Sequence, residues 1–207
     1  VSNGYLVFIP DVVFRKGEPG ASSYDAVVSG VKSLIDRYDF IDKDRIALNG
    51  HSWGGYQIAF LVTRTNMFKA AVSGAPVVNM TSAYGGIRWE SGKSRMFQYE
   101  QTQSRIGGTL WDKPAEFIRN SPLFFLPQVQ TPVLIMHNDK DGSVMWEQGI
   151  EFFMALRRLD KPVWLFNYKG EGHHLKKWEN RLDYSRRVME FYDYYLKDGK
   201  KPEWMKS

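Results

Sequence analysis

Short apolar runs alternate with longer amphipathic segments along the chain, and this alternation restricts the fold more than any other feature. The apolar runs lie at residues 5–9, 45–49, 69–73, 132–136 and 162–167. Each has the length of a strand that is buried on both faces. Helical patterns follow at about residues 22–35, 54–65, 146–159 and 176–197. Strands alternating with helices predict an α/β fold: a mostly parallel sheet of about five strands, with helices on both faces.

The bulk composition predicts one globular domain. The chain has 207 residues, of which 43% are hydrophobic and 25% charged, so residues 1–207 suit one domain with a sizeable core. The net charge is +5, but the densest basic group, at residues 176–187, alternates with acidic residues on a predicted helix. This pattern favours a solvated helix face over a nucleic-acid site. No apolar stretch approaches the length of a membrane span, so we expect no membrane partner.

The chain contains no cysteine, which excludes disulfides, thiolate catalysis and cysteine-based zinc sites. It begins with Val1 and enters a predicted strand almost at once, so we expect a piece of a longer protein. The N-terminus lacks the basic region and apolar core of a signal peptide. The sequence does not decide between a periplasmic and a cytoplasmic location in a bacterial cell.

Residues 50–55 read Gly-His-Ser-Trp-Gly-Gly and lie between a predicted strand and a predicted helix. This G-x-S-x-G pattern is typical of a sharp turn that exposes a nucleophilic serine, here Ser52. We expect backbone segments to crowd the positions two residues before and two residues after the serine, so that only small residues fit there. The backbone N–H of Trp53 lies where it can face the oxyanion that forms after attack.

A serine hydroxyl is a weak nucleophile that needs a base, and the base needs a carboxylate to fix its tautomer. The loop after the fourth predicted strand offers Asp139 and Asp141. The loop after the fifth offers His173 and His174. Parallel strands bring these loops to the same edge of the sheet, and the order Ser, Asp, His is that of α/β-hydrolases.

In these motifs the chain resembles the catalytic domain of the prolyl oligopeptidase family of serine peptidases, which includes dipeptidyl and acylaminoacyl peptidases. The resemblance covers nearly the whole chain and is carried by residues 44–46, 50–56, 121–123, 131–137, 170–173, 179–181 and 195–197. It implies an α/β-hydrolase domain that cleaves peptide or acyl-peptide bonds through an acyl-enzyme, with no metal and no organic cofactor. The family pattern selects Asp141 and His173 as the partners of Ser52.

The resemblance also implies a pocket for the substrate residue that precedes the scissile bond. By position, this pocket is lined by Trp53, Val77, Met80, Tyr84 and Val144. Family members that prefer proline surround its ring with aromatic side chains. Met80 and Ala83 depart from that pattern, which argues against strict proline specificity.

Parts of the family's architecture have no counterpart in the chain. The five predicted strands match the last five of eight, and the β-propeller is absent. The tyrosine that supplies the second oxyanion donor follows the third strand of the family, and no such motif precedes Tyr5. Loss of one donor typically lowers the rate about a hundredfold or more, so we expect weak catalysis. The missing third strand would lie between the first two predicted strands, so these either pair directly or leave an exposed edge that recruits another chain. We therefore expect a tendency to form a homodimer or to aggregate.

Two other functions fit the same sequence. A carboxylesterase or acyltransferase on this fold would use the same three residues, because only the leaving group and the acceptor differ. An inactive fragment of a larger peptidase would retain the fold without turnover.

Overall fold

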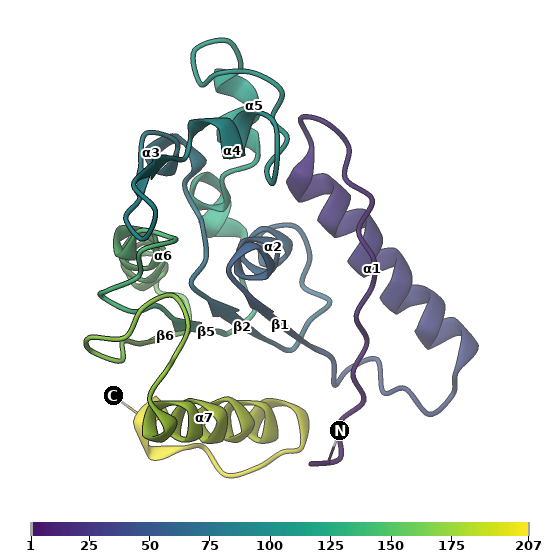
Figure 1. Ribbon diagram of the computed structural model, residues 1–207. Coiled ribbons are helices and arrows are strands. Elements are labelled where there is room, and N and C mark those ends of the chain that lie inside the picture. The colour runs from purple at the N-terminus through teal and green to yellow at the C-terminus, as the bar shows by residue number, and fades with distance from the viewer. Residues whose placement is uncertain (1, 207) are drawn as a thin grey trace.

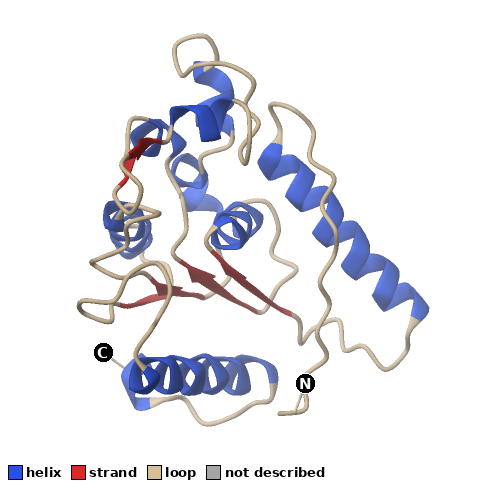
Figure 2. Cartoon of the chain, in the orientation of Figure 1, coloured by secondary structure: helices blue, strands red, loops and turns tan. Residues whose placement is uncertain are grey.

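The computed structural model describes residues 2–206 and has a four-stranded parallel sheet at its centre (Figures 1 and 2). Its strands are β1 (Ala47–His51), β2 (Ala70–Gly74), β5 (Val133–Met136) and β6 (Val163–Phe166). They lie in the order β1-β2-β5-β6, and every neighbouring pair is parallel. The predicted α/β class and parallel sheet are confirmed, although each strand begins one or two residues later than its apolar run.

Helices cover both faces of the sheet. The helices α1 (Pro19–Arg37), α2 (Trp53–Val62) and α6 (Trp146–Arg158) pack on one face, and α7 (Trp178–Leu196) packs on the other, below the sheet in Figure 1. Side chains that alternate along the strands supply the two cores, because successive Cβ atoms point to opposite faces. Val133 and Ile135 face α2 and α6, whereas Leu134 faces α7.

The helices form where apolar residues recur at helical spacing. In α6, Phe152 and Leu156 lie one turn apart and are fully buried. In α7, Phe191 is fully buried among aromatic rings, whereas the basic residues of the helix lie mostly outside. Arg187 donates a hydrogen bond of 2.6 Å to Asp183 one turn earlier. Such i,i+4 pairs are expected on a solvated helix face.

A group of short elements lies above the carboxyl ends of the strands (Figure 1). It comprises α3 (Met80–Tyr84), the hairpin of β3 (Ile87–Arg88) and β4 (Lys93–Ser94), α4 (Met96–Glu100), α5 (Pro114–Arg119) and the 3₁₀ helix η1 (Pro122–Gln128). A second 3₁₀ helix, η2 (Glu203–Met205), follows α7. Two-residue strands are too short to produce a visible alternation in the sequence, so the hairpin has no sequence signature.

The prediction of a buried strand at residues 5–9 is wrong. This segment is extended but joins no sheet, and Leu6 and Ile9 are 73% and 85% exposed. It runs alongside α1 in Figure 1, and Phe8 packs so closely on that helix that a Cβ on Gly30 would lie 3.0 Å from its ring. Tyr5 anchors its beginning by donating a 2.7 Å hydrogen bond to Asp193. An apolar run favours contacts with other apolar side chains, but it does not specify whether these belong to a strand or to a helix.

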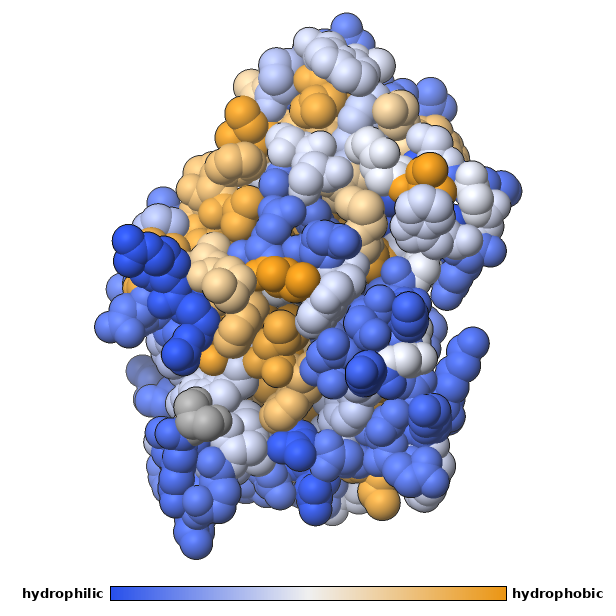
Figure 3. Space-filling view, turned by 90° about the vertical axis from the view of Figure 1, so that its left-hand side faces the viewer, coloured by the Kyte–Doolittle hydropathy of each residue, from blue (hydrophilic) through white to orange (hydrophobic). Residues whose placement is uncertain are grey.

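The sheet ends at β1 on one side and at β6 on the other, and neither edge has a further strand among residues 2–206. The side of the molecule that carries β6 and α6 shows a band of apolar surface (Figure 3). On α6, Met154 is 58% exposed. Open sheet edges and exposed apolar surface favour association with another chain. The homodimer remains a prediction. Of the helices in the described part of the chain, none combines the length and the apolar composition needed to cross a bilayer.

Candidate active site

Ser52 occupies the sharp turn between β1 and α2. Its backbone has φ 59° and ψ −117°, a left-handed region that costs a non-glycine residue of order 1–3 kcal/mol. Hydrogen bonds on both sides hold the turn: Ser52 N donates to Gly74 O (2.8 Å), and Tyr56 N donates to Ser52 O (3.0 Å). The strain therefore persists because β2 and α2 fix the backbone around the serine.

Two glycines of the motif are required by close backbone contacts. A Cβ on Gly50 would lie 2.4 Å from the carbonyl oxygen of Gly54, and a Cβ on Gly55 would lie 2.3 Å from that of Gly74. A Cβ on Gly54 itself would meet nothing beyond the local helix backbone nearer than the Gln57 side chain, at 4.0 Å. The expectation of crowding two residues after the serine is therefore wrong. The crowded position is the third residue after it, where α2 approaches β2.

Side chains from three loops meet at the carboxyl edge of the sheet. His173 Nε2 lies 2.8 Å from Ser52 Oγ, and His173 Nδ1 lies 2.8 Å from Asp141 Oδ2. Because a carboxylate only accepts hydrogen bonds, Nδ1 carries the hydrogen, and Nε2 is free to accept the serine proton. Asp139 lies outside this chain of hydrogen bonds and accepts from Gly170 N instead (2.7 Å).

Asp141 is held as a carboxylate. Its Oδ1 accepts hydrogen bonds of 2.8 Å from the backbone N–H groups of Ser143 and Val144. Its Oδ2 faces His173 and also lies 3.3 Å from His137 Nε2. Burial raises the pKa of Asp141, but the hydrogen bonds from His137 and His173 outweigh burial, so the pKa lies well below its ordinary value. The charge of Asp141 therefore faces the His173 imidazole at neutral pH.

His137 also contributes to the site, although the motifs in the sequence do not assign it a role. It is fully buried at the end of β5, and its Nε2 also lies 3.1 Å from the carbonyl oxygen of Val144. Both neighbours of Nε2 are acceptors, so this nitrogen carries a hydrogen that they share. His137 thereby helps to fix the loop that presents Asp141.

Asn138 joins the aspartate loop to the histidine loop. Its Nδ2 donates to Gly172 O (2.8 Å), and its Oδ1 accepts from Tyr168 N (3.1 Å). Lys140 N adds a bond of 3.2 Å to Glu171 O. These bonds cross between segments about 30 residues apart, so the spacing between Asp141 and His173 follows from pairing that no local motif reveals.

Glu171 fixes the other side of the histidine loop. Its buried carboxylate accepts from the backbone N–H groups of Lys176 (2.8 Å) and Lys177 (3.0 Å) and from Asn180 Nδ2 (2.6 Å). The hydrogen bond from the Lys176 backbone is the main cause of the lowered pKa of Glu171. The loop is thereby attached to the beginning of α7.

His51 lies against the candidate base. Its ring centroid is 4.9 Å from that of His173 and 4.8 Å from that of His174. Burial and the neighbouring imidazoles lower the pKa of His51 to about 4, against smaller raising effects of Asp141 and the His173 backbone. His51 is therefore neutral at pH 7 and adds no charge beside His173.

The side chains expected to line a substrate pocket belong to one apolar cluster beside Ser52. Val77, Met80, Tyr84 and Val144 are all at most 5% exposed and belong to the same cluster as Tyr56. Trp53 borders the cluster and stacks on the Tyr56 ring at 4.4 Å. Tyr56, which follows Ser52 by four residues and was not among the expected pocket residues, is a fully buried member of the same cluster.

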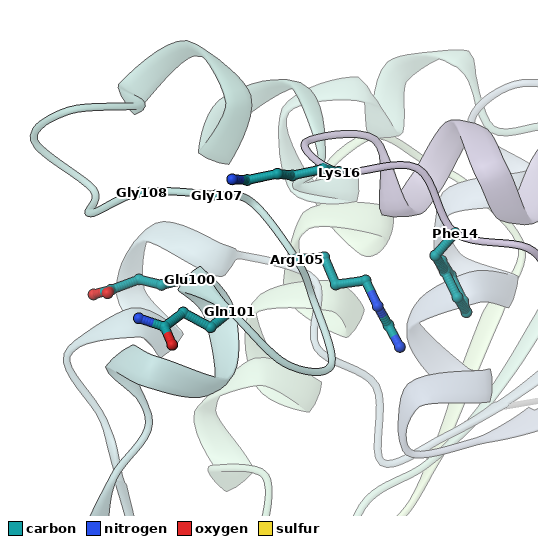
Figure 4. A pocket seen from close by; sticks show the side chains of 7 residues that line it. All are labelled: Phe14, Lys16, Glu100, Gln101, Arg105, Gly107 and Gly108. Atoms are coloured by element: carbon teal, nitrogen blue, oxygen red, sulfur yellow. The ribbon is translucent and has the colours of Figure 1, made fainter.

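An open depression of about 500 Å³ lies next to this cluster (Figure 4). Phe14 connects the depression to the serine loop, because its ring lies 6.1 Å from Trp53. The Arg105 guanidinium lies 4.9 Å from the Phe14 ring, and Figure 4 shows that side chain directed toward Phe14 and away from Lys16. The remaining lining residues are Glu100, Gln101, Gly107 and Gly108.

Comparison with known proteins identifies the family. The model of the prolyl oligopeptidase family matches residues 14–199. The chain belongs to the prolyl oligopeptidase family. It is 31% identical over 166 residues to the uncharacterized peptidase YuxL of Bacillus subtilis, covering 78% of this chain and 23% of that protein. It is 29% identical over 174 residues to the human acylamino-acid-releasing enzyme, covering 81% and 22%.

Solved structures of the family share the fold. The acylaminoacyl peptidase of Pyrococcus horikoshii superposes with a TM-score of 0.79 at 20% identity, covering 93% of this chain and 30% of that chain. The puromycin-hydrolyzing peptidase of Mycobacterium tuberculosis gives 0.76 at 25% identity, covering 87% and 26%. The α/β-hydrolase fold expected from the resemblance is confirmed. The chain spans about a quarter of the length of the relatives it matches.

Proposed function

We propose that the chain hydrolyses peptide or acyl-peptide bonds with Ser52 as nucleophile, His173 as base and Asp141 as the carboxylate that orients the base. The observation that carries the proposal is the pair of 2.8 Å hydrogen bonds that join the three side chains. The left-handed backbone of Ser52 supports it, because such strain at a strand-to-helix turn is typical of an exposed nucleophile.

The reaction follows from the hydrogen-bond order. His173 Nε2 takes the proton of Ser52 Oγ as the oxygen attacks the substrate carbonyl. The Trp53 N–H, at the first residue of α2, stabilises the oxyanion, since it has no acceptor within the helix. The leaving amine takes the proton from His173, which leaves an acyl-Ser52 ester. Water, deprotonated by His173, then releases the acid and restores Ser52.

The names of the relatives support peptide and acyl-peptide bonds as the substrate class. The human relative is an acylamino-acid-releasing enzyme, and other relatives are dipeptidyl-peptidases of Aspergillus species. We place the pocket for an apolar side chain next to the scissile bond at the apolar cluster of Val77, Met80, Tyr84 and Val144. Its buried side chains need to shift by rotation to admit one, because they pack closely without substrate.

Labelling by a fluorophosphonate probe tests the nucleophile. The probe should label the chain, and Ser52→Ala and His173→Ala should abolish labelling while leaving the circular dichroism spectrum unchanged. Asp139→Ala is the matched control, because Asp139 is an equally plausible carboxylate by sequence but lies outside the hydrogen-bond chain. A folded chain that does not label, or one that labels equally in the His173 variant, would refute the proposal.

The leaving group needs a separate assay. Turnover of an aminoacyl-arylamide should be detectable and should vanish in Ser52→Ala. Turnover confined to short-chain aryl esters would assign the chain to the esterases instead. Comparing the turnover of acylated and free aminoacyl-arylamides would then show whether an acylated N-terminus is preferred.

A further inference from the structure

Three of the four histidines of the chain form a compact group next to Ser52. The ring centroids of His51, His173 and His174 lie 4.8–4.9 Å apart in all three pairs. One nitrogen from each ring lies within 4.8 Å of the nitrogens of the other two. Only His173 of the three is required by the proposed reaction, so the presence of the other two rings calls for a further explanation.

We propose that His51, His173 and His174 bind a divalent transition-metal ion of the Zn²⁺ type, and that the bound ion blocks Ser52. Imidazole nitrogens are preferred ligands of Zn²⁺, Cu²⁺ and Ni²⁺. The ion is an inhibitor and not a cofactor, since it occupies the base that the reaction uses. The inhibition rests on the proposed function, whereas the binding of the ion does not.

Each histidine has a property that suits a ligand. His51 Nε2 is buried and has no hydrogen-bond partner among the described residues, so its lone pair or hydrogen is unused. His174 is exposed and free to turn toward its neighbours. His173 donates from Nδ1 to Asp141 at 2.8 Å, the arrangement in which a carboxylate orients a metal-binding imidazole from behind.

The three imidazole rings need to move closer together to share one ion. Two nitrogens on one tetrahedral Zn²⁺ lie about 3.4 Å apart, given Zn–N bonds of about 2.0–2.1 Å. The present nitrogens lie within 4.8 Å of one another, so a pair of nitrogens needs to close by at most about 1.4 Å. His173 contributes Nε2, because Asp141 occupies Nδ1.

The coordination of Nε2 removes the acceptor of the serine proton. His173 Nε2 has one lone pair, which now accepts the hydrogen bond of Ser52 Oγ at 2.8 Å. A metal ion on that lone pair displaces the serine hydroxyl, and the base is lost. The fourth position of a tetrahedral ion is then left to water or to Ser52 Oγ.

Binding is tested first, without reference to activity. Equilibrium dialysis of the 207-residue chain against buffered ZnCl₂ should give one tightly bound ion per chain. His174→Ala should weaken binding at least tenfold, and Lys176→Ala, which removes a nearby exposed side chain, should bind as the unaltered chain does. Titration with Co²⁺ should produce the intense visible absorption of a tetrahedral site. Zinc bound with equal affinity by His174→Ala, or no stoichiometric binding, would overturn the proposal.

Inhibition is tested by serine labelling. ZnCl₂ should slow fluorophosphonate labelling of the unaltered chain, EDTA should restore it, and MgCl₂ at the same concentration should have no effect. His174→Ala should label normally without metal and should need at least tenfold more ZnCl₂ for the same slowing. Stoichiometric zinc binding with no slowing of labelling would overturn the inhibitory role. If the chain does not label at all, the proposed function fails, and the dialysis still decides whether the ion binds.

Discussion

The glycines around Ser52 provide the sharpest test of the local geometry, because Gly50, Gly54 and Gly55 differ in the space that a Cβ atom would have. A Cβ on Gly50 would lie 2.4 Å from Gly54 O and 2.5 Å from Gly54 C, whereas ordinary contacts begin near 3.4 Å. Gly50→Ala therefore forces β1 and the beginning of α2 apart by about 1 Å, and overpacking of this kind costs about 1–3 kcal/mol. We expect the upper part of that range, since both struck atoms belong to the backbone.

Gly54→Ala is the matched control within the same motif. Beyond the local helix backbone its Cβ would meet nothing nearer than 4.0 Å, and φ at Gly54 is not in the left-handed region. Alanine in place of glycine within a helix stabilises by up to about 0.5–1 kcal/mol, and by less near a helix end. The two variants should therefore differ by about 2–3 kcal/mol in the free energy of unfolding.

Urea denaturation followed by tryptophan fluorescence measures this difference, provided that unfolding is two-state. Gly55→Ala should be destabilised about as much as Gly50→Ala, because its Cβ would lie 2.3 Å from Gly74 O. Equal destabilisation by Gly50→Ala and Gly54→Ala would refute the reasoning from backbone contacts. So would a Gly50→Ala variant that unfolds at the same urea concentration as the unaltered chain.

Three further predictions follow from the electrostatics and the loop contacts. Asp141→Asn should slow fluorophosphonate labelling of Ser52 by on the order of 10⁴-fold, since an amide no longer fixes the tautomer of His173; labelling within tenfold of the unaltered rate would contradict this. The pKa of His51 is lowered from 6.5 to about 4, so between these pH values the unfolded chain binds a proton that the folded chain does not. The free energy of unfolding should then decrease as the pH falls from 6.5 to 4. The decrease should be less than the roughly 3 kcal/mol that corresponds to the full pKa shift, because water screens a half-buried ring. Urea titrations at several pH values measure this dependence, and His51→Gln should make it weaker. Asn138→Ala should lower the free energy of unfolding by about 1–3 kcal/mol, because it leaves the Gly172 carbonyl and the Tyr168 N–H without their partner. It should also slow labelling of Ser52. A variant with unchanged stability and labelling would show that the two loops keep their spacing without Asn138.

Much of the fold could be predicted because it depends on local patterns. The helix predicted at 146–159 corresponds to α6 at Trp146–Arg158, and that predicted at 176–197 corresponds to α7 at Trp178–Leu196. Helical periodicity and apolar runs are properties of consecutive residues, so they are visible in one dimension. The segment at 5–9 is the instructive failure, because its apolar composition does not reveal whether a strand or a helix lies beside it.

The sharp turn at Ser52 could be predicted in the same local way. The G-x-S-x-G pattern between a strand and a helix reports a backbone turn, and its conformation at φ 59° depends on the few residues around it. The choice between Asp139 and Asp141 is different. Both follow β5 within the same loop, and the residues alone favour neither. Only the resemblance to the family selects one.

The sequence by itself determined the α/β class, the serine turn and the three loops that meet at one edge of the sheet, because these follow from periodicity, glycine placement and strand order. Only the tertiary structure decided the rest. It placed His137 behind Asp141, joined the two loops through Asn138, gathered three imidazoles around Ser52 and left residues 5–9 outside the sheet. Each of these depends on contacts between residues far apart in the chain, whose partners are chosen by the packing of the whole domain and not by neighbours in sequence.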